Sequence, residues 1–355
     1  MAKWGRSQQL CCGSVTVPLR RGWGLSRWAS AAALFVYIAV GGSLALTWEA
    51  HQTNRRIAHD VSASQVVTKT PTDAVVETYL LVGSDSRAGV DPNSPDAGGI
   101  LGAGAPDGQR SDTIMLLRHN RETGQAVLLS LPRDLWVTIA GTTTKDRINA
   151  AFSNSAGTLV QTIQDNFHLA INHYIAVDFV GFKKVVDAIG GVTVCFPYPT
   201  KDTNTGLNVT NPGCTKLDGI GSLQYTRSRH YQELRNGHWV EDPRSDLDRI
   251  QRQQSFLLSA LNQAQGALGQ NPLLMSSLLD AASASLTLDS TLTLVELKDR
   301  FRDLAGDHLQ RYALPVTGVT IDKKAVLNLD TAAAEPILAY FRGETSTPPM
   351  TVASS

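Results

Sequence analysis

The sequence predicts an α/β sandwich with a central mixed β-sheet, preceded by one transmembrane helix. Short apolar runs typical of buried strands alternate with segments of helical periodicity along most of the chain. One longer apolar run without a charged residue lies near the N-terminus. The chain has 355 residues, of which 42% are hydrophobic and 18% are charged, so it can bury a sizeable core.

Three apolar runs, residues 78–82, 114–118 and 126–131, predict the first strands of the sheet. The segment from Ala88 to Gln109 between the first two runs is rich in Gly, Pro, Ala and Asp, which predicts a long loop. If the three strands form an antiparallel meander, the end of the first, the start of the second and the end of the third share one edge. We therefore expect the polar residues at those three points to cluster.

Further along the chain, helical spacing at residues 148–151, 157–167 and 180–188 alternates with predicted strands at 173–179 and 191–196. A helix is expected to begin near Asp246, a good N-cap, and to end near Gln265, where Gly266 and Gly269 follow. After Pro272 we expect two or three more helices and a strand near residues 312–315.

The uncharged run from Trp28 to Trp48 is long enough, at about 1.5 Å per residue, to cross the hydrocarbon core of a bilayer as a helix. Basic residues and no acidic ones precede it, which predicts a cytoplasmic N-terminus. Two alternatives stay open. A signal peptide could be cleaved near Ser43 and Ala45, or the run could be a buried helix.

These features predict a single-pass protein of the cell membrane. Its parts are a basic cytoplasmic segment (1–27), the membrane helix (28–48), a stalk (49–76), an extracellular folded domain (77–343) and a disordered tail (344–355). Lys plus Arg equals Asp plus Glu at 32 each, so no overall field would attract nucleic acid.

Cys195 and Cys214 are the cysteines of the predicted outer domain, where an oxidising compartment permits a disulfide. Neither a CxxC pair nor suitably spaced histidines accompany them, which makes zinc a poor fit. We favour a structural bridge between them, and two unpaired thiols are the alternative.

Acidic and basic residues stand together at the three points of the expected sheet edge. They are Asp85 with Arg87, Arg110 with Asp112, and Arg133 with Asp134. Carboxylates suit Mg²⁺, and guanidinium groups fit phosphate in a bidentate manner. The pattern therefore predicts a site for a diphosphate and a metal ion. Taken singly, each Asp could instead cap a loop.

Arg227 and Arg229 follow an apolar stretch that we interpret as a strand, whose period of two would point both guanidinium groups to one face. An anion between them would relieve their repulsion, although a solvated pair is also tolerable. On the predicted helix after Asp246, a spacing of i, i+3, i+4 and i+7 puts Arg249, Arg252, Gln253 and Phe256 on one face. The alternative is a solvated face with an Asp246–Arg249 pair.

In this order, behind one apolar segment, the motifs resemble the LytR-CpsA-Psr family of cell-wall glycopolymer ligases, over roughly Thr78 to Gly343. The resemblance implies an α/β/α sandwich that binds a polyprenyl diphosphate, with Mg²⁺ or Mn²⁺ and arginines at the head group and an apolar groove for the tail. Such proteins transfer a wall polymer from that carrier to peptidoglycan.

Residue by residue, the resemblance implies metal binding by Asp85 and Asp112. It implies diphosphate contacts from arginines and one amide: Arg87, Arg110, Arg133, Arg147, Arg227, Arg229, Arg249 and Gln253. Asp85, Arg133 and Asp134 are the predicted catalytic residues. Arg147 stands where many members have lysine, and the extra residues His230 to Ser245 resemble actinobacterial members.

The predicted function is therefore a metal-dependent phosphotransferase of cell-wall assembly, with a lipid-linked glycan donor, a peptidoglycan acceptor and no nucleic-acid partner. Hydrolysis of the same lipid diphosphate, non-catalytic regulation of the envelope, and a scaffold that only binds the lipid are the alternatives. The sequence contains neither a GxSxG motif nor a Walker motif, so a serine nucleophile and a P-loop nucleotide site have no support.

Overall fold

The computed structural model describes residues 57–71, 74–86, 111–242, 246–271, 274–301, 304 and 309–349. The chain divides into two units, Met1–Glu49 and Ala50–Ser355, and the first lies wholly outside the described residues. The predicted membrane segment, Trp28 to Trp48, falls in that first unit. Among the described residues, no helix is both long and apolar enough to cross a membrane.

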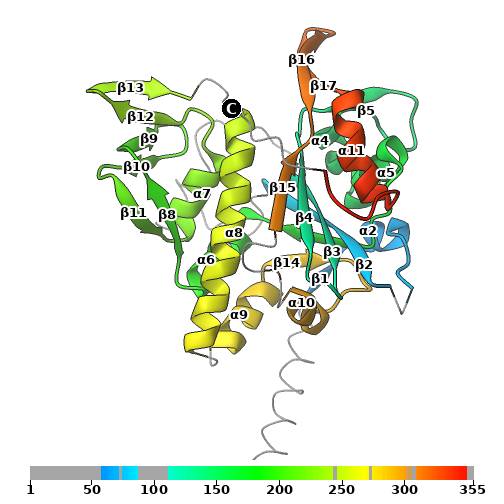
Figure 1. Cartoon of the computed structure of the whole chain (residues 1–355), viewed down its shortest axis with the longest axis horizontal. Helices are drawn as coiled ribbons and strands as arrows, with labels where there is room; N and C mark the ends of the chain where they lie inside the picture. The colour runs from blue at the N-terminus through cyan, green and yellow to red at the C-terminus, as the bar shows by residue number, and fades with distance from the viewer. Residues whose placement is uncertain are drawn as a thin grey trace, which may run out of the picture. The chain divides into compact units, whose positions relative to one another are not determined.

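A mixed sheet forms the centre of the second unit (Figure 1). Within the described residues it has seven strands in the order β1-β14-β7-β2-β3-β4-β15. Their bounds in that order are Ala58–His59, Leu286–Leu288, His173–Val177, Val76–Ser84, Ser111–Asn120, Ala126–Leu131 and Leu309–Ala313. Strands β2, β3 and β4 form the antiparallel meander that the apolar runs predicted, while β7 is parallel to β2 and β15 is parallel to β4.

Helices cover both faces of this sheet. Leu80, Leu116 and Leu129 project from one face into a core shared with α2 (Val61–Val66), α4 (Ile148–Asn154), α5 (Ala156–Phe167) and α11 (Thr331–Arg342). On the other face, Met115 and Leu128 lie in a core with α8 (Asp246–Gln270), α9 (Leu274–Ser283) and α10 (Leu294–Phe301). Because both faces are buried, the central strands read as continuous apolar runs.

A smaller lobe packs against α8 (Figure 1). It contains α6 (Phe179–Ala188), α7 (Gly219–Arg227) and the antiparallel pair β8 (Val192–Phe196) and β11 (Gly213–Leu217). Its second sheet has the order β10-β9-β12-β13, formed by Leu207–Val209, Thr200–Asp202, Gln232–Arg235 and His238–Glu241. Cys195 and Cys214 lie opposite each other on β8 and β11 and form a disulfide.

Two hairpins complete the described elements: β5 (Trp136–Thr138) with β6 (Lys145–Arg147), and β16 (Val316–Ile321) with β17 (Lys324–Leu329). The strand expected near residues 312–315 is β15, which ends earlier, at Ala313. The end predicted for the long helix is wrong, because α8 continues through Gly266 and Gly269 to Gln270. Neither glycine has a positive φ or a close neighbour, so each is accommodated within the helix.

The tail prediction falls partly outside the described residues. Residues 344–349 are described, and the Tyr312 hydroxyl donates a hydrogen bond to the carbonyl of Pro349.

Candidate functional site

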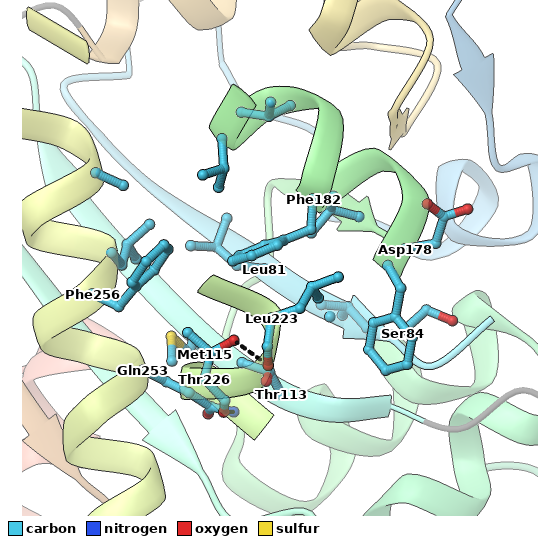
Figure 2. A pocket seen from close by; sticks show the side chains of 18 of the residues that line it. Leu81, Ser84, Thr113, Met115, Asp178, Phe182, Leu223, Thr226, Gln253 and Phe256 are labelled. Atoms are coloured by element: carbon cyan, nitrogen blue, oxygen red, sulfur yellow. Dashed lines mark hydrogen bonds between the residues drawn. The ribbon is translucent and has the colours of Figure 1, made fainter. Parts of the chain in front are cut away.

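An apolar cavity of about 310 Å³ lies between the large sheet and helices α6, α7 and α8 (Figure 2). Strands β2, β3 and β7 supply one wall, and the helices supply the others. Apolar side chains that line it include Leu81, Met115, Ile175, Phe182, Leu223 and Phe256. A volume of this size falls at the lower end of ligand pockets, and its lining suits a hydrocarbon chain.

Polar and charged residues also line the cavity. Ser84 and Thr113 come from the edge of the sheet, and Arg227, Arg249 and Gln253 come from α7 and α8. Three of the predicted diphosphate contacts are therefore brought together beside the cavity. The guanidinium of Arg227 lies 4.3 Å from the centre of the Phe179 ring, a cation–π contact that fixes its direction.

The helix face predicted on α8 is confirmed, and the solvated-face alternative is wrong. Arg249 is only 2% exposed and Phe256 4%, while Gln253 donates a hydrogen bond of 3.1 Å from Nε2 to the Thr226 carbonyl. A buried cation in the first turn lies at the positive end of the helix dipole. That combination favours binding of an anion nearby. The Asp246 side chain, part of the alternative pair, lies outside the described part.

The strand predicted before Arg227 and Arg229 is wrong, because this segment forms helix α7, and Arg227 is its last residue. Asp218 caps the helix by accepting a hydrogen bond of 2.8 Å from the Gly221 backbone. That N-cap was the signal in the sequence that could have found the helix. The shared direction of the two arginines expected from a strand therefore does not apply.

The loop after α7 is held by a buried carboxylate, Asp202, which is 1% exposed. Its Oδ2 accepts hydrogen bonds from the Ser228 hydroxyl at 2.6 Å and from the Arg229 and His230 backbone at 3.1 and 3.0 Å. Burial raises the pKa of Asp202, but hydrogen bonds from Ser228 and several backbone N–H groups outweigh it and lower the pKa. Asp202 therefore fixes the loop that carries Arg229.

Arg252 holds the same loop from α8. Its Nη2 donates a hydrogen bond of 2.7 Å to the Ser228 carbonyl, and its Nη1 lies 3.1 Å from an Asp242 oxygen. The guanidinium also lies over the Tyr231 ring, 4.5 Å from its centre. The spacing predicted the correct helix face for Arg252 but no function for it. Its partners are distant in sequence, so no local pattern could reveal them.

The end of β2 and the start of β3 bring the backbones of the two predicted metal-binding aspartates close together. Ser84 on β2 pairs with Ser111 on β3, so the next residues, Asp85 and Asp112, stand at the same end of adjacent strands. Arg87 and Arg110 lie outside the described residues, as does the side chain of Asp112. In the part that is described, no three His, Cys, Asp or Glu side chains converge on a metal position.

Arg133, Asp134 and Arg147 form a separate group beside the β16–β17 hairpin. The Nε atoms of Arg133 and Arg147 lie 3.3 and 3.4 Å from the two carboxylate oxygens of Asp134. Arg147 also donates a hydrogen bond of 2.8 Å to the Ala325 carbonyl. None of the three lines the cavity. Asp134 thus contacts guanidinium groups on both oxygens, and Arg147 is engaged by the hairpin.

Helices on both faces of the sheet, an apolar cavity at the ends of its strands and arginines beside that cavity define an α/β domain with a site that combines apolar walls and cationic side chains. The LytR_cpsA_psr family model matches residues 42–341. The chain therefore belongs to the LytR-CpsA-Psr family, as the motifs indicated.

Named relatives and solved structures agree with this assignment. The probable cell wall biosynthesis protein LcpB of Corynebacterium glutamicum is 36% identical over 56% of this chain and 45% of the relative. The polyisoprenyl-teichoic acid–peptidoglycan teichoic acid transferase TagU of Oceanobacillus iheyensis is 35% identical over 46% of this chain and 50% of the relative. The chain thus spans about half the length of these two relatives.

Among solved structures, the LytR-Csp2A-Psr enzyme from Actinomyces oris matches with a TM-score of 0.59 and 26% identity. The match covers 81% of this chain and 96% of that structure. It supports the mixed α/β architecture with a central mixed sheet.

Proposed function

We propose that this protein transfers a glycopolymer from a polyprenyl diphosphate carrier to peptidoglycan. One observation carries the proposal: an apolar cavity of about 310 Å³ is lined by Arg227, Arg249 and Gln253 in addition to its hydrocarbon walls. A prenyl chain fits the apolar part, and guanidinium groups fit a diphosphate. The name of the TagU relative, polyisoprenyl-teichoic acid–peptidoglycan teichoic acid transferase, supports the same reaction.

In this reaction an acceptor hydroxyl attacks the phosphorus that carries the glycan, and polyprenyl phosphate leaves. Charge grows on the leaving phosphate as the bond breaks. Arg227 and Arg249, with Arg229 on the loop held by Asp202, neutralise that charge. The arginines are positioned before the substrate arrives, so little reorganisation is needed during the reaction. As part of the proposal, Arg87 and Arg110 are assigned to the same diphosphate site. Arg133 and Arg147, whose group with Asp134 does not line the cavity, would contact the diphosphate only outside the cavity.

Asp85 and Asp112 would hold the Mg²⁺ or Mn²⁺ ion. The register of β2 and β3 puts the backbones of these two residues at one end of the strands, and such an ion takes one or two carboxylates together with substrate phosphates. When bound, the ion would offset negative charge on the diphosphate.

The proposed setting is the outer face of the cell membrane, with Trp28 to Trp48 as an uncleaved anchor and the cytoplasm on the N-terminal side. A reporter fused to the C-terminus tests this orientation. Activity of an extracellular reporter supports it, whereas activity only of a cytoplasmic reporter contradicts it.

The decisive assay uses the full-length chain, a polyprenyl diphosphate glycan, Mg²⁺ and purified peptidoglycan. If the protein is a transferase, the glycan becomes bound to peptidoglycan through a phosphodiester, and an equal amount of polyprenyl phosphate is released. If the protein is instead a pyrophosphatase, free glycan phosphate forms whether or not peptidoglycan is present. Binding without any product would favour a scaffold or regulator. The same assay without Mg²⁺ tests separately whether transfer depends on the metal ion.

A further inference from the structure

Asp178 lies at the edge of the sheet that carries Asp85 and beside the cavity. Strand β7 runs parallel to β2, with Val177 opposite Gly83, so Asp178 follows β7 where Ser84 and Asp85 follow Gly83. Asp178 also lines the cavity and, in Figure 2, stands at the same end of it as Ser84, away from Phe256. Asp178 is therefore a third aspartate at this end of the strands, where the backbones of Asp85 and Asp112 also lie.

One oxygen of Asp178 has a structural task. Asp178 is the N-cap of α6, and its Oδ1 accepts a hydrogen bond of 2.7 Å from the Gly181 backbone. A Cβ at Gly181 would lie 2.6 Å from the Ser285 carbonyl oxygen, so the first turn of α6 sits too close to that segment for a side chain. Because this turn is closely packed, its hydrogen bond to Oδ1 fixes the direction of the Asp178 carboxylate. In the part of the chain that the structure describes, no hydrogen bond reaches its Oδ2.

The surroundings of Asp178 differ from those of a cap that serves only its helix. The next residue, Phe179, carries the Arg227 guanidinium over its ring at 4.3 Å. A carboxylate beside a site for an anionic diphosphate weakens donor binding by like-charge repulsion. A carboxylate that weakens donor binding can still speed the reaction if it acts on the neutral reactant, which is the acceptor hydroxyl.

Asp85 and Asp134, the two carboxylates among the predicted catalytic residues, suit the role of proton acceptor less well. Asp134 has guanidinium groups 3.3 and 3.4 Å from its two oxygens, and it does not line the cavity. Asp85 is assigned to the metal ion. Asp178 offers an oriented carboxylate at the cavity with one oxygen left for the substrate.

We propose that Asp178 is the general base of the transfer reaction, an inference that rests on the proposed function. The acceptor O–H bond breaks, and its proton goes to Asp178 Oδ2 while the acceptor oxygen bonds to the phosphorus that carries the glycan. The bond from that phosphorus to the bridging oxygen breaks, and its electron pair leaves with polyprenyl phosphate. The proton then passes from Asp178 to water, and no other reactant is consumed.

The test replaces Asp178 by Asn in the full-length chain. Asparagine caps helices as well as aspartate does, so α6 is preserved while the proton-accepting oxygen is lost. The matched control is Asp218→Asn at the N-cap of α7, where Oδ1 accepts a hydrogen bond of 2.8 Å from Gly221 at an exposed position away from the cavity. Asp178→Ser with Asp218→Ser repeats the comparison with a second capping residue if the Asn variant folds poorly.

We expect kcat of Asp178→Asn to fall about 10²- to 10⁴-fold, the usual contribution of a general base, while Asp218→Asn keeps wild-type turnover. Donor affinity in Asp178→Asn should equal or exceed that of wild type, because an anion beside the diphosphate is gone. Turnover equal to that of the control would overturn the inference. So would recovery of kcat at higher Mg²⁺ concentration, which would make Asp178 a metal ligand. If wild type itself transfers no glycan, the proposed function fails instead.

Discussion

The Ser228 hydroxyl donates a hydrogen bond of 2.6 Å to the buried Asp202 carboxylate, which joins strand β9 to the loop that carries Arg229. The same oxygen accepts the backbone N–H groups of Arg229 and His230. A single carboxylate in the small lobe thus holds the end of α7 in place beside the cavity.

Asp202→Asn should weaken donor binding more than it weakens the fold. A carboxylate has two oxygens that accept hydrogen bonds, whereas a side-chain amide has one. At least one buried N–H or O–H donor around residue 202 therefore loses its partner, at a cost of about 1–3 kcal/mol. We expect KM for the donor to rise about tenfold with a modest drop in the thermal unfolding temperature. Asp165→Asn at an exposed position is the control. Equal donor affinity in the two variants would show that the loop does not depend on Asp202.

Arg229→Lys should keep the fold and lose much of the activity, because an ammonium group cannot make the bidentate contact of a guanidinium. We expect kcat/KM to fall about 10- to 100-fold in the transfer assay. Arg235→Lys is the matched control in the same lobe, since Arg235 pairs with Glu233 and does not line the cavity. Similar kinetics for both variants would contradict a bidentate contact at Arg229.

Ala260→Trp should obstruct the cavity, because Ala260 lines it one helical turn beyond Phe256. Affinity for a donor with a long prenyl chain should fall about tenfold or more, equivalent to about 1.4 kcal/mol per factor of ten. A donor with a short chain should be affected much less. Gln265→Trp, at an exposed position of the same helix, is the control. Equal losses for both donors would argue against the cavity as the site of the tail.

Stability should depend on the ionisation of Glu77, which is 1% exposed and lies 2.6 Å from an Arg300 nitrogen. Burial is the largest influence and raises its pKa, but hydrogen bonds from His173 and Tyr79 and the charge of Arg300 lower the pKa from 4.5 to about 2. The folded-state pKa is the lower one. The stabilisation is therefore complete above about pH 4.5 and is lost as pH falls toward about 2.

Glu77→Gln should unfold at a lower temperature at neutral pH and show a flatter pH dependence between those two values. Glu122→Gln at an exposed turn is the control. Thermal unfolding followed by circular dichroism measures both variants. An unchanged slope in Glu77→Gln would mean that other carboxylates cause the acid sensitivity.

Local patterns predicted the sheet centre well, because β2, β3 and β4 are buried on both faces and the central residues of each are mostly apolar. The same pattern put Asp85 and Asp112 at one edge, which the register of β2 and β3 confirms for their backbone. The segment before Arg227 was mistaken for a strand because its glycines and short length hide the helical period.

Other parts of the site depend on contacts that no local pattern records. Asp202 meets Ser228 across 26 positions of the chain, and Arg147 meets Ala325 across 178. The strands β9, β10, β12 and β13 have only three or four residues each, too few for a clear alternation. The cavity also forms between helices and strands that are far apart in sequence, so its size could not be predicted.

The most direct test of lipid capture by the cavity is photo-crosslinking of the full-length chain in membranes. The probe is a polyprenyl diphosphate glycan with a photoreactive group on its distal isoprene units, and labelled peptides are mapped by mass spectrometry. We predict labelling of α6 and α8 around Phe182 and Phe256, abolished by excess unlabelled donor. Labelling spread over other surfaces, or labelling that the competitor leaves unchanged, would contradict capture of the lipid in this cavity.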